Sequence, residues 1–432
     1  MNRRLLVLFC LPGSVSVCIG AVAAESPSQT ETNPLSFDEA LSRILGRSTA
    51  IATQQASLES TRAGALPSKF AFVPSVSFDA KSANASGIAL QGPYSLVEAT
   101  SQYNLFHWGA DFAGLGAGNA DIESQESQLL AVTLQAEDDA VSALIAEVQQ
   151  QKQLDIDRDV ATMQEKLEKI ARERFSHGFL ARQEVEKVSV DLDNANAAVA
   201  DAVLLEINTR TQLESFLGPA LVIPEWPWKE KLSGSGQKLL ALPWNVEARP
   251  DWRAARNHAI AEDKRYVRDE RLLLPSLDAS FSYGYYNGVS SSVTDSGGAY
   301  GWNSAITVSL PFFDHLTTYS NARAQLYVRA AADVAVTQVE RTAQAAWEAA
   351  RDGFKIALDA AVARERTLGV SRRLYQDSLK RFQAGRITAN DLVIDQRRLL
   401  DSELFSVQGW AAAHLAFPRL CHAFGKKITE CW

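Results

Sequence analysis

Residues 174–178 read RFSHG, and residues 381–385 read RFQAG, 207 positions further along the chain. Two other landmarks recur at the same offset: residues 105–106 (LF) as 312–313 (FF), and residues 216–218 (FLG) as 423–425 (AFG). Self-similarity at a fixed offset indicates a duplicated structural unit. We therefore predict two copies of one unit, each built around a turn of the form Phe-x-x-Gly.

Long helices are predicted on both sides of each turn. No proline lies between Pro93 and Pro219, and Gly178 is the only glycine between Gly118 and Gly218. In the first unit the pattern predicts a helix of about sixty residues that ends near residue 177, roughly 90 Å long, and a return helix that ends near residue 217. In the second unit the same pattern predicts two long helices, over 321–384 and 389–424. Helices of this length are not those of an ordinary globular core.

Ahead of each long helix, apolar and polar residues alternate with the period of a β-strand. The alternation covers residues 75–81 and 97–105 in the first unit, and residues 277–285 and 302–310 in the second. Each unit therefore predicts one β-hairpin with strands of about ten residues. Short helical segments are predicted before the hairpins, at 35–62 and 251–272.

Composition narrows the class of protein. The chain has 432 residues, of which 46% are hydrophobic and 22% charged, and its formal charge is −8. This mild acidity gives no support for nucleic-acid binding, and the composition is not that of a disordered or collagen-like chain. Arg3 and Arg4 precede an apolar stretch that ends in the small residues of 21–24 (AVAA), which predicts a secretory signal peptide over 1–24, with an uncleaved anchor helix as the alternative. No later apolar run reaches the roughly 18 residues of a spanning helix.

The predicted strands suit a membrane barrel, with a small soluble sheet packed on helices as the alternative. They carry aromatic residues of the kind that form interfacial girdles: Tyr94, Tyr283, Tyr285, Tyr286, Tyr300 and Trp302. Four strands cannot close a barrel, since closure takes about eight. Two or three chains would have to contribute, and the apolar stripes of the long hairpins also need neighbours.

In order, spacing and duplication, these segments resemble the TolC-like outer membrane efflux protein family. The resemblance is carried by residues 35–41 (LSFDEAL), 310–314 (LPFFD), 321–325 (NARAQ) and 381–404, and it covers nearly the whole mature chain. It implies an α+β membrane protein that forms a homotrimer. Each chain would give four strands to a β-barrel in the outer membrane, which a long α-helical barrel would continue into the periplasm.

The resemblance also implies a function and partners. The protein would be the passive exit duct of a tripartite efflux pump or of a type I secretion system, together with a periplasmic adaptor (membrane fusion protein) and an inner-membrane transporter. The alternative is a periplasmic coiled-coil scaffold or adaptor without a membrane-spanning barrel. An adaptor should carry one helical hairpin with a lipoyl-like or barrel domain, whereas this chain has two hairpins, each preceded by strands.

The duplication sets the expected domain boundaries. Repeat 1 covers 35–218, a linker covers 219–248, repeat 2 covers 249–425, and a C-terminal tail covers 426–432. In the linker, Gly234-Ser235-Gly236 predicts a turn. The resemblance places this linker in a belt around the equator of the tunnel.

By the resemblance, the two Phe-x-x-Gly turns form the periplasmic tip on which the adaptor docks. The candidate docking residues are Phe175, Gly178, Phe382, Gly385 and Arg386. Both glycines also have a purely structural interpretation as helix-ending residues with positive φ. Arg386 is expected to pair with a carboxylate and help hold the tip closed, although a single exposed pair contributes only about 0–1 kcal/mol.

Acidic residues just past the turns are candidates for a constriction of the lumen. The first family aspartate falls on Asp391, and Glu184 is its counterpart in repeat 1. Asp395 lies one place beyond the second family position, which Ile394 occupies here, so Asp395 is rotated about 100° around the helix from that position. For Asp391 a solvated helix face is the alternative interpretation.

The sequence contains no pattern that indicates catalysis. The six histidines lack the spacing of a zinc site, and no phosphate-binding loop or nucleophile motif occurs. We therefore expect no enzyme activity, no metal and no cofactor. Cys421 and Cys431 form a candidate disulfide that would staple the C-terminal tail in an oxidising compartment.

Overall fold

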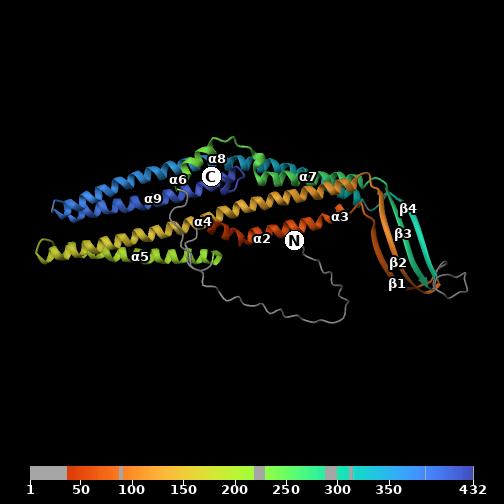
Figure 1. The fold of residues 1–432 in the computed structure, drawn as a ribbon, viewed down its shortest axis with the longest axis horizontal. Coiled ribbons are helices and arrows are strands. Elements are labelled where there is room, and N and C mark those ends of the chain that lie inside the picture. The colour runs from red at the N-terminus through yellow and green to blue at the C-terminus, as the bar shows by residue number, and fades with distance from the viewer. Residues whose placement is uncertain are drawn as a thin grey trace, which may run out of the picture.

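The computed structural model describes residues 37–86, 91–217, 229–287, 299–310, 314, 316–384 and 386–431. The predicted signal peptide, the first part of the predicted linker and Gly385 lie outside the described residues. The described part is an elongated bundle of helices with a sheet at one end (Figure 1).

The two halves of the chain have the same order of elements. The first half contains α1 (Phe37–Gly46), α2 (Thr49–Gly64), α3 (Leu66–Lys69), β1 (Ser75–Ser86), β2 (Gln91–Phe106), α4 (Ala110–Ser176) and α5 (Arg182–Leu217). The second half contains α6 (Lys229–Leu240), η1 (Val246–Ala248), α7 (Pro250–Arg271), β3 (Ser276–Asn287), β4 (Ala299–Ser309), α8 (Thr317–Gln383), α9 (Ala389–Ala423) and η2 (Ile428–Glu430). The predicted strands and long helices are confirmed.

The helices α4 and α8 have 67 residues each, which corresponds to about 100 Å. Both begin earlier than predicted. For α4 the difference arises from glycines that the sequence pattern treats as a break. A Cβ at Gly114 would lie 3.6 Å from Cδ of Arg268, and one at Gly118 would lie 3.3 Å from Cβ of Ala65. Both glycines therefore lie inside the helix. At Gly118 the end of α2 packs so closely that an added Cβ would require a small shift, whereas a Cβ at Gly114 would make ordinary van der Waals contact with α7.

None of the helices among the described residues carries a stretch apolar and uncharged enough to cross a membrane.

The four strands form one antiparallel sheet in the order β1-β2-β3-β4. Directly opposed residues of antiparallel strands point to the same side, so the register divides the side chains into two faces. We call one of them the apolar face: Val76, Phe78, Ala80, Val97, Ala99, Tyr103, Leu277, Ala279, Phe281, Tyr283, Tyr285, Tyr300, Trp302, Ile306 and Val308. The other face carries mainly Ser, Thr, Asn, Gln, Asp and Glu.

A β-bulge modifies the predicted alternation at the end of β2. The register between β2 and β3 shifts between Asn104 and Phe106, and Phe106 lies opposite Leu277. The extra residue in the bulge reverses the alternation. Phe106, and not the predicted Leu105, therefore joins the apolar face.

The main hydrophobic core lies midway along the long helices. Buried residues from six helices meet there, and they include Phe37, Leu41, Leu144, Ile145, Leu213, Leu232, Phe354, Phe417 and Leu420. At this level the short helices α1 and α6 add to the layers formed by α4, α5, α8 and α9 (Figure 1). The long hairpins need this extra layer, because two antiparallel helices alone enclose little interior.

The prediction of a turn at Gly234-Ser235-Gly236 is wrong, because all three residues are helical in α6. Gly236 faces the core, and a Cβ added there would collide with the ring of Phe354. Nothing lies within 4 Å of a Cβ at Gly234. Glycine at position 236 therefore serves the close packing of α6 on α8 and not a chain reversal.

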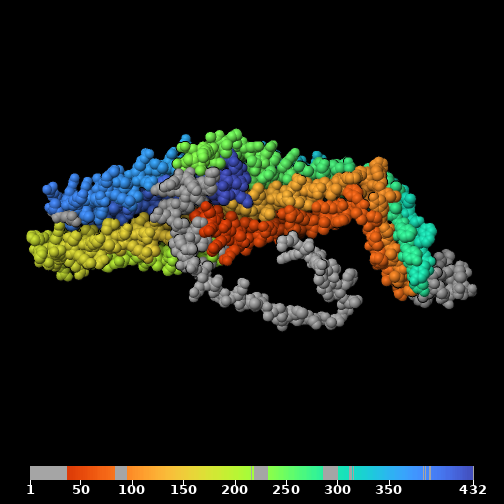
Figure 2. Space-filling model, viewed as in Figure 1, coloured from red at the N-terminus to blue at the C-terminus, as the bar shows by residue number. Residues whose placement is uncertain are grey.

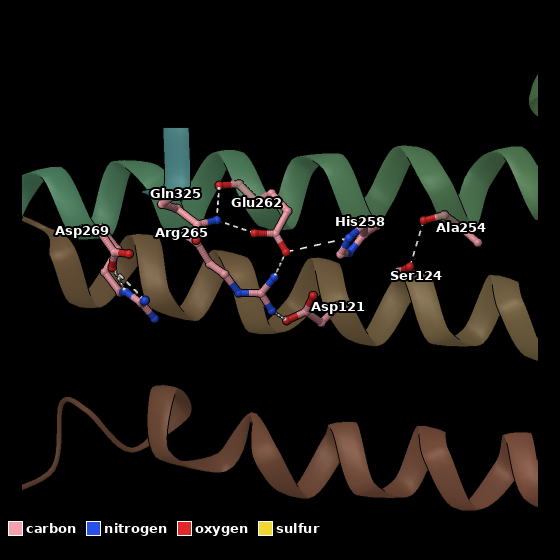
Figure 3. A network of polar contacts seen from close by, with 9 residues as sticks. Asp121, Ser124, Ala254, His258, Glu262, Arg265, Asp269 and Gln325 are labelled. Carbon is pink, nitrogen blue, oxygen red and sulfur yellow. Dashed lines mark hydrogen bonds and ion pairs between the residues drawn. The ribbon is translucent and has the colours of Figure 1, made fainter. Parts of the chain in front are cut away.

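A polar network joins the two halves of the chain near the sheet (Figure 3). Arg265 of α7 forms ion pairs with Asp121 of α4 and with Glu262 of α7. Gln325 of α8 donates a hydrogen bond to the same Glu262 carboxylate. Burial raises the pKa of Asp121, and the charge of Arg265 opposes this rise. Since α4 belongs to the first half and α7 and α8 to the second, the halves are not separate domains.

We predict that Gly236→Ala lowers the free energy of unfolding by about 1–3 kcal/mol, because the added methyl group overpacks the core against Phe354. Gly234→Ala is the matched control, and it should be neutral or stabilise the protein by up to about 1 kcal/mol through better helix propensity. Thermal unfolding followed by circular dichroism measures both. Equal effects of the two substitutions would contradict the assignment of Gly236 to a close helix contact.

Candidate functional site at the hairpin tips

The tips of the two helical hairpins lie next to each other at the end of the molecule farthest from the sheet. Hairpin 1 consists of α4 and α5, and hairpin 2 consists of α8 and α9. Figure 2 shows the yellow tip of hairpin 1 beside the blue tip of hairpin 2. The two Phe-x-x-Gly stretches therefore come together in space, although 207 residues separate them.

Gly178 ends α4 in the conformation expected of a helix-ending glycine. Its φ is +74°. Its N–H donates to the Phe175 carbonyl at 2.9 Å, and the N–H of Phe179 donates to the Arg174 carbonyl at 2.9 Å. These two bonds form a Schellman motif, which satisfies the last carbonyl groups of the helix. In hairpin 2 the N–H of Arg386 donates to the Arg381 carbonyl, also at 2.9 Å.

The two phenylalanines of the repeat have different environments. Phe175 is 46% exposed and its neighbour Phe179 is 80% exposed, whereas Phe382 is 3% exposed. Phe382 packs with Leu167 of α4 and Leu392 of α9. Hairpin 1 thus presents aromatic rings to its surroundings, and hairpin 2 uses its phenylalanine to join the tips.

Arg174 connects the two tips through the same phenylalanine. Its guanidinium lies 4.4 Å from the centre of the Phe382 ring, and Nη2 donates to the Phe382 carbonyl at 3.4 Å. A second contact between the hairpins joins Arg397 of α9 to Asp191 of α5 at 3.7 Å. Arg386 is exposed and forms no ion pair within the described residues. Among the described residues, the polar contacts between the hairpin tips therefore come from Arg174 and Arg397 and not from Arg386. They add to the packing of Phe382 on Leu167.

A groove of about 580 Å³ lies between the hairpins at this level. Its apolar lining includes Leu167, Ile170, Val188, Val393 and Ile394. Charged side chains from both hairpins also line it: Arg174, Glu184, Lys187, Asp191 and Arg397. Of the predicted site residues, the groove brings together Glu184 and Phe382.

Asp391 has a structural role in addition to the predicted one, and its signal in the sequence is the capping-box pattern Thr388-x-x-Asp391 ahead of apolar residues. Its carboxylate accepts hydrogen bonds from Oγ1 of Thr388 at 2.7 Å and from the Thr388 N–H at 3.1 Å. The Asp391 N–H in turn donates to Oγ1 of Thr388, which completes a capping box at the start of α9. These hydrogen bonds from Thr388 lower the pKa of Asp391, so it is ionised at neutral pH.

The other two acidic candidates differ from Asp391. Asp395 accepts a hydrogen bond from Oγ of Ser378 at 2.5 Å and pairs with Arg398 at 3.0 Å. Glu184 lies in the first turn of α5 and is exposed. The residue of repeat 1 that corresponds to Thr388 is Ala181, which has no side-chain oxygen and cannot form a capping box.

Cys421 and Cys431 are bonded in the structure, with their Cα atoms 6.2 Å apart. The bond returns the C-terminal tail to the end of α9. Ile428, between the two cysteines, is buried in the main core. The described residues contain no cluster of His, Cys, Asp and Glu that could hold a metal ion.

Sequence reasoning did not identify Arg174, Asp191 and Arg397 as residues that connect the hairpins. The only signal was the position of Arg174 directly before Phe175 in the repeated stretch. Its counterpart Arg381 is exposed and does not make the equivalent contact. Contacts between two helices depend on the rotation of each about its axis, and the sequence of either helix alone does not give this rotation.

Comparison with known proteins supports the resemblance. Residues 246–425 match the family model of the outer membrane efflux protein, and no curated protein matches the chain. The fold is similar to that of the CmeC outer membrane channel of Campylobacter jejuni, with a TM-score of 0.78 and 15% identity over 98% of this chain and 94% of that one.

Two more solved structures are similar. VceC of Vibrio cholerae has a TM-score of 0.76 and 15% identity, covering 90% of this chain and 96% of that one. The outer-membrane channel OprN has a TM-score of 0.76 and 18% identity, covering 90% of this chain and 89% of that one. The resemblance to TolC-like outer membrane efflux proteins is confirmed, and at these identities the solved structures establish the fold.

We predict that Arg174→Ala loosens the tip of hairpin 2 from hairpin 1. A partly exposed cation–π contact contributes about 0.5–1 kcal/mol, which corresponds to about 2- to 5-fold faster amide hydrogen exchange around Phe382. Arg172→Ala is the control, because Arg172 pairs only with Glu168 of its own helix. Amide hydrogen exchange of residues 379–393, measured by mass spectrometry, tests this prediction. Equal exchange rates in the two variants would contradict the contact between Arg174 and Phe382.

Proposed function

We propose that this chain, whose residues 246–425 match the family model of the outer membrane efflux protein, is one subunit of a homotrimeric channel in the outer membrane with a periplasmic extension. Three four-stranded sheets would form a β-barrel, and the long hairpins of three chains would form an α-helical tunnel beneath it. The channel would be the passive exit duct of a tripartite efflux pump or of a type I secretion system.

The apolar face of the sheet is the observation that carries this proposal. Several of its side chains are largely exposed in the single chain: Phe78 by 82%, Ile306 by 73% and Trp302 by 69%. A continuous exposed apolar surface of this kind is a site of contact with a membrane or a protein. Strands of 11 to 16 residues are long enough to cross a bilayer, which takes about 9–11 residues.

The edges of the sheet support assembly from several chains. Among the described strands, β1 and β4 each have a neighbour on one side only. An unpaired edge exposes backbone N–H and C=O groups, and in a membrane these groups have to be paired. Pairing β4 of one chain with β1 of the next would close the barrel. Closure takes about eight strands, which two copies would reach, and we propose three because the resemblance implies them.

The hairpin tips suit the partners that the resemblance implies. The exposed rings of Phe175 and Phe179 and the apolar groove between the hairpins offer a docking surface for a periplasmic adaptor. The adaptor would connect the channel to an inner-membrane transporter, which supplies the energy. The contacts of Arg174 and Arg397 between the hairpins would be among those that separate or shift when the tip opens.

The alternative function, a periplasmic scaffold or adaptor without a barrel, leaves the apolar face without an explanation. In a scaffold this face would have to be covered by protein, and no described element of the chain covers it, since most of its large side chains, among them Phe78, Trp302 and Ile306, stay exposed. Membrane insertion gives the face a partner. The two functions differ in whether the purified protein inserts into lipid and conducts ions.

We predict that the protein purified in detergent is a trimer that conducts ions in planar bilayers. Val97→Arg should abolish insertion, because Val97 lies on the apolar face near the middle of β2 and a lipid-facing arginine costs about 2–4 kcal/mol at the midplane. Thr100→Arg is the control, since Thr100 lies on the polar face of the same strand. Electrical recording and chemical cross-linking provide the measurements.

A water-soluble monomer without conductance would exclude the channel and leave the scaffold. Equal insertion of the two arginine variants would show that the apolar face does not contact lipid.

We also predict that Asp391 influences ion selectivity through its charge and not through its helix cap. Asp391→Asn removes the charge but keeps an oxygen that can accept the hydrogen bonds of Thr388, and it should weaken cation preference without affecting trimer assembly. Thr388→Ala removes the cap at a cost of about 1 kcal/mol and keeps the charge, so selectivity should not change. Reversal potentials in a salt gradient measure the effect. Unchanged selectivity in Asp391→Asn would place this carboxylate outside the constriction.

A further inference from the structure

The C-terminal tail packs on the middle of α4, at the level of the main core. After α9 the chain turns at Gly425, whose φ is +70°. The following segment buries Ile428, which is 1% exposed, and returns to α9 through the disulfide of Cys431. The tail therefore lies between the end of hairpin 2 and the helix that begins hairpin 1.

His422, in the last turn of α9, lies between two carboxylates of α4. Its Nε2 is 3.2 Å from Oε2 of Glu137, and its Nδ1 is 3.1 Å from Oδ1 of Asp138. The His422 side chain is 12% exposed and that of Glu137 is 5% exposed. The three groups thus form a largely buried cluster that bridges α9 and α4.

The positions of the two ring nitrogens determine which protonation state fits. A neutral imidazole has one N–H donor, and its other nitrogen carries a lone pair. Here each nitrogen faces a carboxylate, which only accepts hydrogen bonds when ionised. Only the protonated ring can donate to both carboxylates, and a neutral ring would direct its lone pair at one of them.

The same cluster holds the tail. Oε2 of Glu137, which lies 3.2 Å from Nε2 of His422, also accepts a hydrogen bond from the N–H of Ile428 at 3.2 Å. A buried carboxylate is costly unless it is paired and hydrogen-bonded. The charge of His422 therefore stabilises the carboxylate on which the tail is anchored.

Among the described residues, no other charged group pairs with these three side chains. Besides α4, the helices α6 and α8 and the segment η2 pack against α9, and the end of α9 also touches Trp244 and the chain at Ala248 and Arg249. The charge of Arg249 is paired with Asp251. The nearest basic residues along the chain, Arg419, Lys426 and Lys427, form no ion pair with Glu137 or Asp138 within the described residues. The net environment of the ring is therefore negative.

We propose that His422, Glu137 and Asp138 form a proton-operated clasp, which fastens the C-terminal tail and the end of hairpin 2 to α4 and tightens as the surrounding compartment becomes more acidic. A clasp at this place fixes how the two hairpins are set relative to each other where they share the main core. It requires neither a ligand nor a partner and is independent of the proposed function.

The direction of the effect follows from the charges. Burial by itself lowers the pKa of His422, but the hydrogen bonds and charges of Asp138 and Glu137 outweigh burial and raise the pKa above its usual value. The stabilisation is therefore fully present below the unfolded pKa, about 6.5, and is lost as the pH rises through the folded pKa.

The test compares the full-length protein with His422→Gln, which cannot be protonated, between pH 5.5 and pH 9. We expect the melting temperature of the wild type to exceed that of the variant by about 2 °C or more at pH 6, and the difference to shrink as the pH rises. Hydrogen exchange of residues 426–431, corrected for the intrinsic pH dependence, should be slower in the wild type at pH 6 and converge with the variant at pH 9.

His258→Gln is the matched control, because His258 is 54% exposed, pairs with Glu262 at 3.8 Å and lies away from the C-terminal tail. It should leave the tail exchange unchanged at every pH. A constant difference between the wild type and His422→Gln across the pH range would overturn the proposal, since it would reveal a packing role alone.

If His422→Gln does not fold, the variant Asp138→Asn tests the proposal instead. It keeps the shape of the side chain and removes one of the two carboxylates that face the ring. We expect the midpoint of the pH-dependent tail exchange to move to lower pH than in the wild type. An unchanged midpoint would contradict the clasp.

Discussion

The apolar face of the sheet is the constraint on which the rest of the structure depends, because no element among the described residues covers it. The register of four antiparallel strands collects aromatic and branched side chains on one side and polar side chains on the other. In the proposed function, the membrane covers the apolar face and neighbouring chains pair with the open edges. The long helices extend from the sheet.

The long helices are held together by two regions of contact that differ in character. Near the sheet, the network around Arg265 joins α4, α7 and α8 through ion pairs and hydrogen bonds. Midway along the bundle, α1 and α6 complete an apolar core, in which Gly236 allows α6 to approach Phe354. Beyond this core toward the tips, each hairpin continues with little cover, so the few contacts between the hairpins gain importance there.

The two hairpins have the same order of helices and nearly the same helix lengths, but not the same contacts. Phe175 and Phe382 occupy equivalent positions, yet one is exposed and the other lies beneath Arg174. Asp391 caps α9 together with Thr388, whereas the equivalent end of hairpin 1 has Ala181. A channel whose tip opens in response to a partner would benefit from such a difference, because one hairpin can stay anchored while the other moves.

Hydrophobic period, proline and glycine act over short stretches of chain, and they were enough to predict the four strands, most of each long helix and the turn at Gly178. They could not show that the first turns of α4 and α8 are helical. The packed structure was needed to show that Gly236 serves helix packing, that Arg174 and Arg397 join the hairpins, and that His422 lies between two carboxylates 284 and 285 positions away along the chain. Each of these depends on the rotation and offset of helices that are distant in sequence, and packing of the whole chain sets these quantities.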